Sequence, residues 1–191
     1  MNRQQLPNLI TCFRILLVTP ILWGLIAGNY QLAFYSFALA GCSDGIDGYL
    51  ARQYGWTSYF GSIADPLADK ILLMSSFVAL CWLGFVPIWL LLVVVFRDIW
   101  IMMGVVIYHY MVGQPKFTPS FISKLNTFLQ ILLITFLLLH LAFGLFSQFF
   151  IDVLMYVVLL TSLASFIDYT WVWGKRALRG HGVPQNESSS F

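Results

Sequence analysis

Six apolar stretches, each long enough to cross a lipid bilayer, follow one another along the chain with short connections. A transmembrane helix needs about 20 mostly apolar residues. The stretches lie at 8–28, 31–54, 58–84, 87–111, 121–146 and 149–174. The chain is 60% hydrophobic and only 9% charged, whereas a soluble domain carries about 25% charged residues. We therefore expect an all-α integral membrane protein with six transmembrane helices.

The first, third and fifth connections contain no lysine or arginine, whereas seven cations lie beside or within the other connections and the termini. They lie near the N-terminus, the second and fourth connections and the C-terminus, as Arg3, Arg52, Lys116, Lys124, Lys175, Arg176 and Arg179. Cytoplasmic loops of membrane proteins carry an excess of Lys and Arg. Both termini are therefore predicted to be cytoplasmic, in the inner membrane if the source is a bacterium.

The length of the chain leaves room for a single membrane domain, which we place at residues 1–175. Residues 176–191 form a polar tail, rich in small residues, that we expect to be disordered. The net charge is +2 and the sequence contains no dense basic stripe, which argues against nucleic acid as a partner. Membrane lipid is the expected surrounding.

Aspartates cluster around the second connection. The chain has eight acidic residues, and four of them, Asp44, Asp47, Asp65 and Asp69, lie within 26 positions. A carboxylate at membrane depth is costly and is rare without a function or a partner. The cluster is therefore the strongest functional signal in the sequence.

The spacing of these aspartates predicts where they point. Residues three or four apart share one face of a helix, so Asp44 and Asp47 share a face of the second predicted helix. Asp65 and Asp69 share a face of the third. Since a short polar connection joins the two helices, we expect the carboxylates to converge near the cytoplasmic surface.

Four converging carboxylates cannot all remain ionised without cations. Oxygen ligands with no His or Cys nearby favour Mg²⁺, Mn²⁺ or Ca²⁺. Small residues beside the aspartates leave room for a ligand, and Arg52 and Lys70 could meet phosphate charge. The combination describes a pyrophosphate site. The structural alternative is that Asp65 caps a helix and that Asp44 and Asp47 pair with Arg52 and Lys70 as interfacial salt bridges.

The complete segment resembles the signature of the CDP-alcohol phosphatidyltransferase family. Its eight fixed positions are matched by Asp44, Asp47, Gly48, Ala51, Arg52, Gly61, Asp65 and Asp69. The resemblance implies transfer of the phosphatidyl group of CDP-diacylglycerol to an alcohol, with release of CMP. It also implies a two-metal site of Mg²⁺ or Mn²⁺, a homodimer, and an active site open to the cytoplasmic leaflet.

The resemblance also implies roles for the matched residues. Asp44, Asp47 and Asp65 would bind the metal pair, and Asp69 would share in metal binding while acting as general base. The CDP-lipid would contact Asp44, Gly48, Ala51, Arg52 and Gly61. Two metals can stabilise the entering and leaving oxygens of an in-line displacement, and a carboxylate can take the proton of the attacking alcohol.

Two further segments bear on the acceptor alcohol. Residues 7–14 resemble the opening of family members that make phosphatidylglycerol phosphate and cardiolipin. Arg14, in this segment, needs either an aspartate of the cluster or a substrate phosphate as partner; the simpler alternative is that it extends to the membrane surface. Residues 118–127 resemble the eukaryotic-type cardiolipin synthases, because Asn126 stands where the phosphatidylglycerol phosphate synthases more often have a second lysine.

Arg97 and Lys124 are the other candidate acceptor contacts. The Arg97-Asp98 pair resembles the cardiolipin group, and Arg97 would either contact the acceptor phosphate or form a buried ion pair. Lys124 would either contact the acceptor phosphate or only mark the cytoplasmic side of the membrane. We therefore expect a cardiolipin synthase using phosphatidylglycerol. The alternatives are a phosphatidylglycerol phosphate synthase using glycerol 3-phosphate and, from other classes, a divalent-cation transporter or a membrane scaffold without enzymatic activity.

Overall fold

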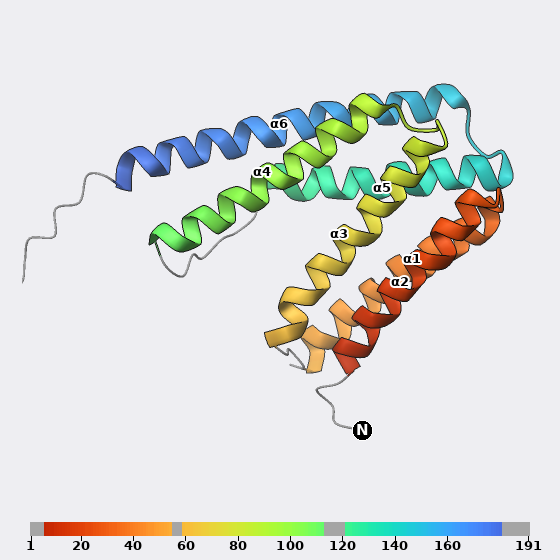
Figure 1. The fold of residues 1–191 in the computed structure, drawn as a ribbon, viewed down its shortest axis with the longest axis horizontal. Helices are drawn as coiled ribbons and strands as arrows, with labels where there is room; N and C mark the ends of the chain where they lie inside the picture. Colours follow the sequence, from red (N-terminus) through yellow and green to blue (C-terminus); the bar gives the residue numbers. More distant parts are fainter. Residues whose placement is uncertain (1–5, 55–58, 113–120, 181–191) are drawn as a thin grey trace, which may run out of the picture.

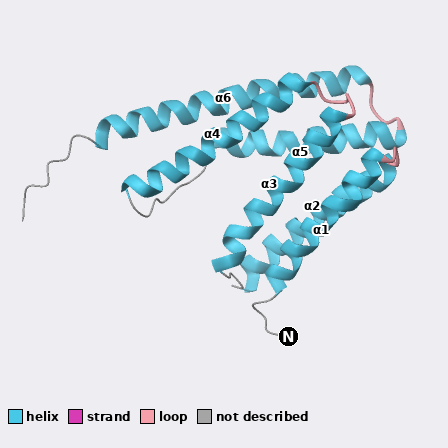
Figure 2. Cartoon of the chain, in the orientation of Figure 1, coloured by secondary structure: helices cyan, strands magenta, loops and turns pink. Residues whose placement is uncertain are grey.

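The chain folds into six α-helices, seen in a computed structural model that describes the backbone of residues 6–54, 59–112 and 121–180 (Figure 1). Side chains are described for residues 13–43, 45, 68–104 and 121–171. The described residues contain no strand (Figure 2). The helices are α1 (Leu6–Ile26), α2 (Tyr30–Tyr54), α3 (Tyr59–Trp82), α4 (Ile88–Val112), α5 (Phe121–Phe143) and α6 (Gln148–Gly180).

The predicted all-α class and the number of helices are confirmed. The helix ends agree with the predicted stretches to within three residues, except that α6 continues to Gly180. Among the described residues, two helical segments are long and apolar enough to cross a membrane: Phe121–Phe143, with a mean hydropathy of 2.0, and Gln148–Trp171, with 2.2. A shorter apolar segment, Phe13–Ile26, lies in α1.

Residues with turn or capping character lie at the predicted places, where one helix ends and the next begins. Gly28 follows α1 with φ +70°, a conformation that glycine adopts without steric cost. The side chain of Asn29 then accepts a hydrogen bond from the backbone N–H of Leu32 at 3.1 Å, which caps α2. Ser147 does the same for Phe150, at 3.3 Å, where α6 begins.

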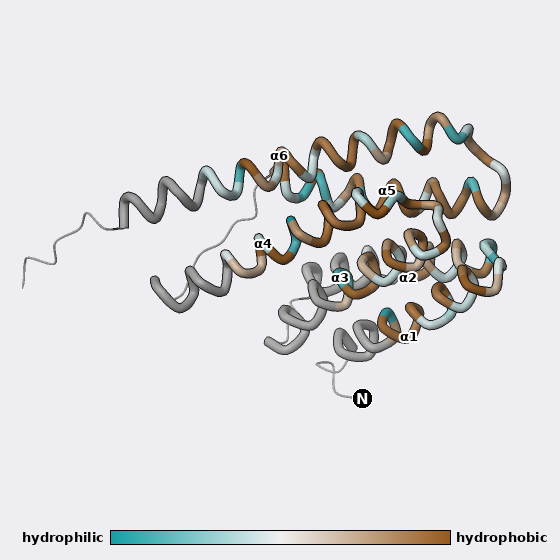
Figure 3. Tube along the Cα trace, turned by 45° about the horizontal axis from the view of Figure 1, so that its top comes forward, coloured by the Kyte–Doolittle hydropathy of each residue, from teal (hydrophilic) through white to brown (hydrophobic). Residues whose placement is uncertain are grey.

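The helices pack as two rings of four that share α3 and α5. In the first ring, α1 and α5 each pack against both α2 and α3. In the second ring, α4 packs against α3 and α6, and α5 packs against the same two helices. Figure 1 shows α4 and α6 running side by side. The described parts of α4 and α5 are predominantly hydrophobic and are interrupted by hydrophilic residues (Figure 3).

An apolar core runs through both rings. Its buried members include Ile21, Phe37, Leu80, Leu133 and Ile151, which come from five different helices. The core therefore fixes the relative positions of α1, α2, α3, α5 and α6, and the polar groups between the helices stand out against it.

Candidate active site

Arg14 and Asp69 form an ion pair between α1 and α3. Arg14 Nη1 donates to Asp69 Oδ1 at 2.5 Å. The arginine side chain is 2% exposed and that of the aspartate 41%. The pair meets the expectation that Arg14 is satisfied by an aspartate of the cluster. It brings the predicted general base into the first ring, with a positive charge fixed beside it.

The other signature residues have side chains that lie outside the described residues. The backbone of these residues is described and is helical. Asp44, Asp47, Gly48, Ala51 and Arg52 lie in α2, and Gly61 and Asp65 lie in α3. In the described part of the chain, α2 and α3 are joined through α1 and α5 rather than packed directly together. The two signature helices therefore lie diagonally across the first ring there.

The chemistry of the signature residues fits a hard divalent cation. The four aspartates supply carboxylate oxygens alone, the ligands that Mg²⁺ and Mn²⁺ favour. The side chains that the structure describes include no group of three His, Cys, Asp or Glu that could hold a metal ion. Of the four aspartates, only Asp69 is among them, and its 41% exposure leaves the side chain accessible.

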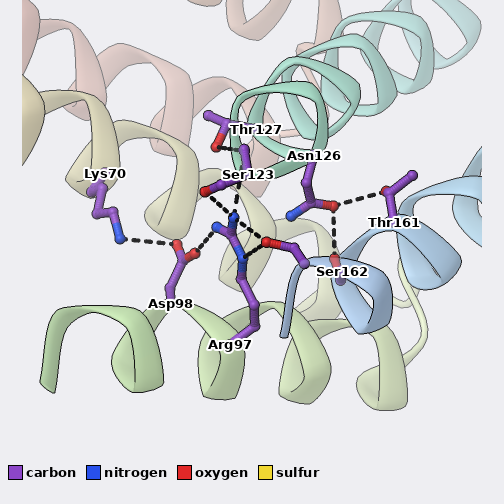
Figure 4. Close-up of polar contacts among 9 residues, drawn as sticks. Lys70, Arg97, Asp98, Ser123, Asn126, Thr127, Thr161 and Ser162 are labelled. Carbon is purple, nitrogen blue, oxygen red and sulfur yellow. Dashed lines mark hydrogen bonds and ion pairs between the residues drawn. The ribbon is translucent and has the colours of Figure 1, made fainter. Parts of the chain in front are cut away.

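Arg97 joins three helices of the second ring (Figure 4). The side chain comes from α4 and is 4% exposed. Its Nη1 donates to Asp98 Oδ1 at 2.6 Å, and its Nη2 donates to Ser123 Oγ of α5 at 2.5 Å. Ser165 Oγ of α6 accepts from both Nε, at 3.2 Å, and Nη2, at 2.9 Å. The buried ion pair with Asp98, one of the two expected alternatives, is thus present.

Lys70 links this network to α3. Its Nζ lies 3.5 Å from Asp98 Oδ2, so Asp98 stands between Lys70 and Arg97, as Figure 4 shows. Lys70 follows Asp69 directly in the sequence. Asp69 of α3 therefore contacts α1 in the first ring, and Lys70, the next residue, contacts α4 in the second.

Asn126 is a buried contact between α5 and α6. It is 0% exposed, and its Oδ1 accepts hydrogen bonds from Thr161 Oγ1 and Ser162 Oγ, both at 2.9 Å (Figure 4). Lys124, two residues earlier on α5, is exposed. The candidate acceptor residues thus differ in environment: Asn126 and Arg97 are interior, whereas the Lys124 side chain is accessible.

The hydroxyl partners of this network were not predicted from the sequence. Thr161, Ser162 and Ser165 occur in an apolar helix at positions one and three residues apart, which place them close together around the helix. Ser, Thr and Asn side chains hydrogen-bond across membrane helices. A run of hydroxyl residues in the sixth apolar stretch was the signal that could have revealed them.

Comparison with known proteins agrees with the signature. Residues 4–167 match the family model for CDP-alcohol phosphatidyltransferase. The chain is 34% identical over 146 residues to a probable CMP-forming cardiolipin synthase of Drosophila melanogaster, covering 68% of this chain and 45% of the relative.

Relatives named for the alternative reaction, phosphatidylglycerol phosphate synthesis, have a similar sequence identity to this chain. The chain is 35% identical to a chloroplastic CDP-diacylglycerol–glycerol-3-phosphate 3-phosphatidyltransferase of Oryza sativa subsp. japonica, covering 86% of this chain and 56% of the relative. It is 33% identical to a probable phosphatidylglycerophosphate synthase of Mycobacterium tuberculosis (strain H37Rv), covering 93% and 84%. The chain thus spans about half the length of the fly and rice relatives.

Proposed function

The chain belongs to the CDP-alcohol phosphatidyltransferase family, and from this we propose that it transfers the phosphatidyl group of CDP-diacylglycerol to an acceptor alcohol and releases CMP. The observation that carries the proposal is the complete acidic signature from Asp44 to Asp69 within the matched region. The buried Arg14, paired with Asp69, supports it, because the pair holds the carboxylate of the proposed general base in place.

In the proposed reaction, the acceptor hydroxyl oxygen bonds to the phosphorus of the phosphatidyl group. The bond from that phosphorus to the CMP phosphate breaks, CMP leaves, and Asp69 takes the hydroxyl proton. Asp44, Asp47, Asp65 and Asp69 would hold Mg²⁺ or Mn²⁺, which neutralises diphosphate charge when bound. Gly48, Ala51, Arg52 and Gly61 would contact the CDP moiety, together with Asp44.

For the acceptor, we propose phosphatidylglycerol and therefore cardiolipin synthesis. The relatives carry names of both types, so support comes from the second ring. Asn126 is a neutral, buried side chain engaged with α6, and the Arg97 guanidinium is already bonded to Asp98, Ser123 and Ser165. In the described part of the second ring, few cationic donors are left to meet the dianionic phosphate of glycerol 3-phosphate. Lys124 and Arg14 are the candidates to contact the single phosphodiester charge.

We further propose that residues 1–175 form one domain with six spans and both termini in the cytoplasm, followed by the tail 176–191, and that the protein is a homodimer. The absence of Lys and Arg from the first, third and fifth connections supports this sidedness. The active site would then open to the cytoplasmic leaflet, because the signature flanks the second connection.

An acceptor panel tests the proposed function. The purified chain in lipid nanodiscs receives CDP-diacylglycerol with either phosphatidylglycerol or glycerol 3-phosphate, and CMP and the lipid product are measured. We expect CMP and cardiolipin with phosphatidylglycerol, loss of both with EDTA, and recovery with Mg²⁺ or Mn²⁺. Product with glycerol 3-phosphate alone would replace the main proposal with the alternative. No CMP with either acceptor would overturn the enzymatic function, and metal flux into sealed vesicles would then favour the transporter.

A further inference from the structure

Helix α3 is packed unevenly on its two sides. Among the described residues, it packs closely against α1 and only sparsely against α4 and α5. A cavity of about 30 Å³ between α3, α4 and α5 interrupts the packing on that second side, and Phe77 of α3 and Val94 of α4 are among the residues that line it. Interdigitated side chains fix how a helix is turned about its axis. Apolar packing therefore constrains α3 less on this side than on the side of α1.

Two ion pairs hold α3 at adjacent residues. Asp69 Oδ1 accepts from Arg14 Nη1 of α1 at 2.5 Å, and Lys70 Nζ lies 3.5 Å from Asp98 Oδ2 of α4. Successive residues of an α-helix are about 100° apart around its axis, so the two contacts lie in different directions. A rotation of α3 about its axis would strain both of them.

The carboxylate that meets Lys70 is itself firmly held (Figure 4). Asp98 Oδ1 accepts from Arg97 Nη1 at 2.6 Å, and the Arg97 guanidinium also donates to Ser123 of α5 and Ser165 of α6. The side chains of Arg97 and Asp98 are only 4% and 13% exposed. Through Arg97, Asp98 is therefore a fixed point braced by α5 and α6, against which Lys70 can hold α3.

We infer that Lys70 is a positioning residue, which sets the rotation of α3 through Asp98 and so keeps Asp69 turned toward Arg14 in the first ring. The inference rests on the proposed function, since it assumes that Asp69 is the general base. A general base must lie within hydrogen-bond reach of the proton that it takes, and a displacement of about 1 Å can lower a rate by about 10²-fold.

The alternative role for Lys70 is direct contact with a substrate phosphate, which its charge also permits. The two roles differ in what the lysine acts through. A positioning lysine affects the reaction only through Asp69, whereas a phosphate contact affects substrate binding whether or not Asp69 is present.

The effect of Lys70 is therefore tested with and without Asp69. Lys70→Met and Lys70→Arg are made in the wild type and in Asp69→Asn. The kcat and KM of CMP release are measured with radiolabelled CDP-diacylglycerol, per amount of protein in the monodisperse peak of size-exclusion chromatography. We expect Lys70→Met to lower kcat about 10-fold in the wild type, with an unchanged KM for CDP-diacylglycerol, and to leave the residual kcat of Asp69→Asn unchanged. Lys70→Arg should retain most of the wild-type kcat, because a guanidinium can also pair with Asp98.

Thermal unfolding in detergent measures the ion pair without substrate. Because the two charges interact, the change in Tm caused by Lys70→Met should be more unfavourable in the wild type than in Asp98→Asn. Val94→Ala is the matched control, because Val94 is buried, lines the same cavity and lies one turn before Asp98. This variant should lower Tm and leave the kcat per folded protein unchanged.

Three results would overturn the inference. These are an equal fall of kcat with and without Asp69, a raised KM for CDP-diacylglycerol at unchanged kcat, and equal changes in Tm with and without Asp98. The raised KM would assign Lys70 to a substrate phosphate. In each case CMP release by the wild type would still support the proposed function, whereas its absence with either acceptor would overturn that function and the inference with it.

Discussion

At the scale of single residues, Asp69 is placed to meet two demands with one carboxylate. It pairs with the buried Arg14 at 2.5 Å, yet 41% of its side chain is exposed. A general base needs both access to the substrate and a geometry held by its neighbours. The exposed aspartate with a buried partner provides this combination.

The role of Asp69 is tested by Asp69→Asn. The asparagine Oδ1 can still accept from Arg14, so the fold should be retained, but an amide cannot take the alcohol proton. We expect CMP release to fall by about 10²–10⁴-fold, with unchanged elution in size-exclusion chromatography. Asp152→Asn is the control, because Asp152 is exposed and bonds to Gln148 within α6. Activity near that of the wild type would show that Asp69 is not the general base.

Arg97 presents the second question at this scale, whether a buried arginine serves the substrate or the fold. Its three nitrogens donate to groups on Asp98, Ser123 and Ser165, and a lysine is a point charge that cannot reproduce this planar geometry. We expect Arg97→Lys to lower the free energy of unfolding by about 2–3 kcal/mol, with the KM for both acceptors unchanged. A raised KM for the acceptor at unchanged thermal stability would instead show that Arg97 contacts the phosphate.

At the scale of helices, the sequence was sufficient to predict where the helices begin and end. It was insufficient to predict which side chains of neighbouring helices contact one another. Apolar stretches broken at Gly28 and Ser147 predict helix ends because these residues adopt turn or capping conformations. Arg14 could be expected to need a partner, but spacing along the chain could not choose between Asp69 and a phosphate. The contacts of Asn126 with Thr161 and Ser162 depend on how α5 and α6 meet, which hydropathy does not encode.

The packing of α1 against α2 depends on one glycine. A Cβ added to Gly24 would lie 2.8 Å from Ala33 N and 2.9 Å from Asn29 O. Both are backbone atoms, which cannot move away as the end of a flexible side chain could. We expect Gly24→Ala to destabilise the protein by about 1–3 kcal/mol, measured by thermal unfolding in detergent. Gly41→Ala is the matched control in α2, where nothing lies within 4 Å, so it should be neutral or stabilising by up to about 1 kcal/mol. Equal stability of the two variants would contradict the close approach.

At the scale of the whole molecule, the two rings separate the proposed catalytic carboxylate from the buried Arg97 network. The first ring contains the Arg14–Asp69 pair, and the second contains the Arg97 network. Since α3 belongs to both, Asp69 and Lys70 face different rings from adjacent positions. Helix α3 therefore connects the ion pair of the first ring to the polar network of the second. No pattern in the sequence predicted this division, because it arises from which helices pack together.

The sidedness of the rings in a membrane is the remaining question for the whole molecule. Helix α6 has 33 residues, about 50 Å at 1.5 Å per residue, which exceeds the roughly 30 Å hydrocarbon core. In the proposed topology, its C-terminal turns, with Lys175, Arg176 and Arg179, would extend beyond the hydrocarbon region. If those cations are cytoplasmic, six spans place the first and fifth connections on the opposite side.

Cysteine labelling tests that topology. Ala27→Cys and Leu145→Cys, both at exposed positions of these connections, are made with Cys12, Cys42 and Cys81 replaced by serine. In sealed bacterial cells with a permeabilised outer membrane, we expect a membrane-impermeant maleimide to label both positions. A C-terminal tag should be cleaved by added protease only in inverted vesicles. Labelling of one position without the other would require an odd number of spans between them, whereas the four intervening helices predict that both lie on the same side.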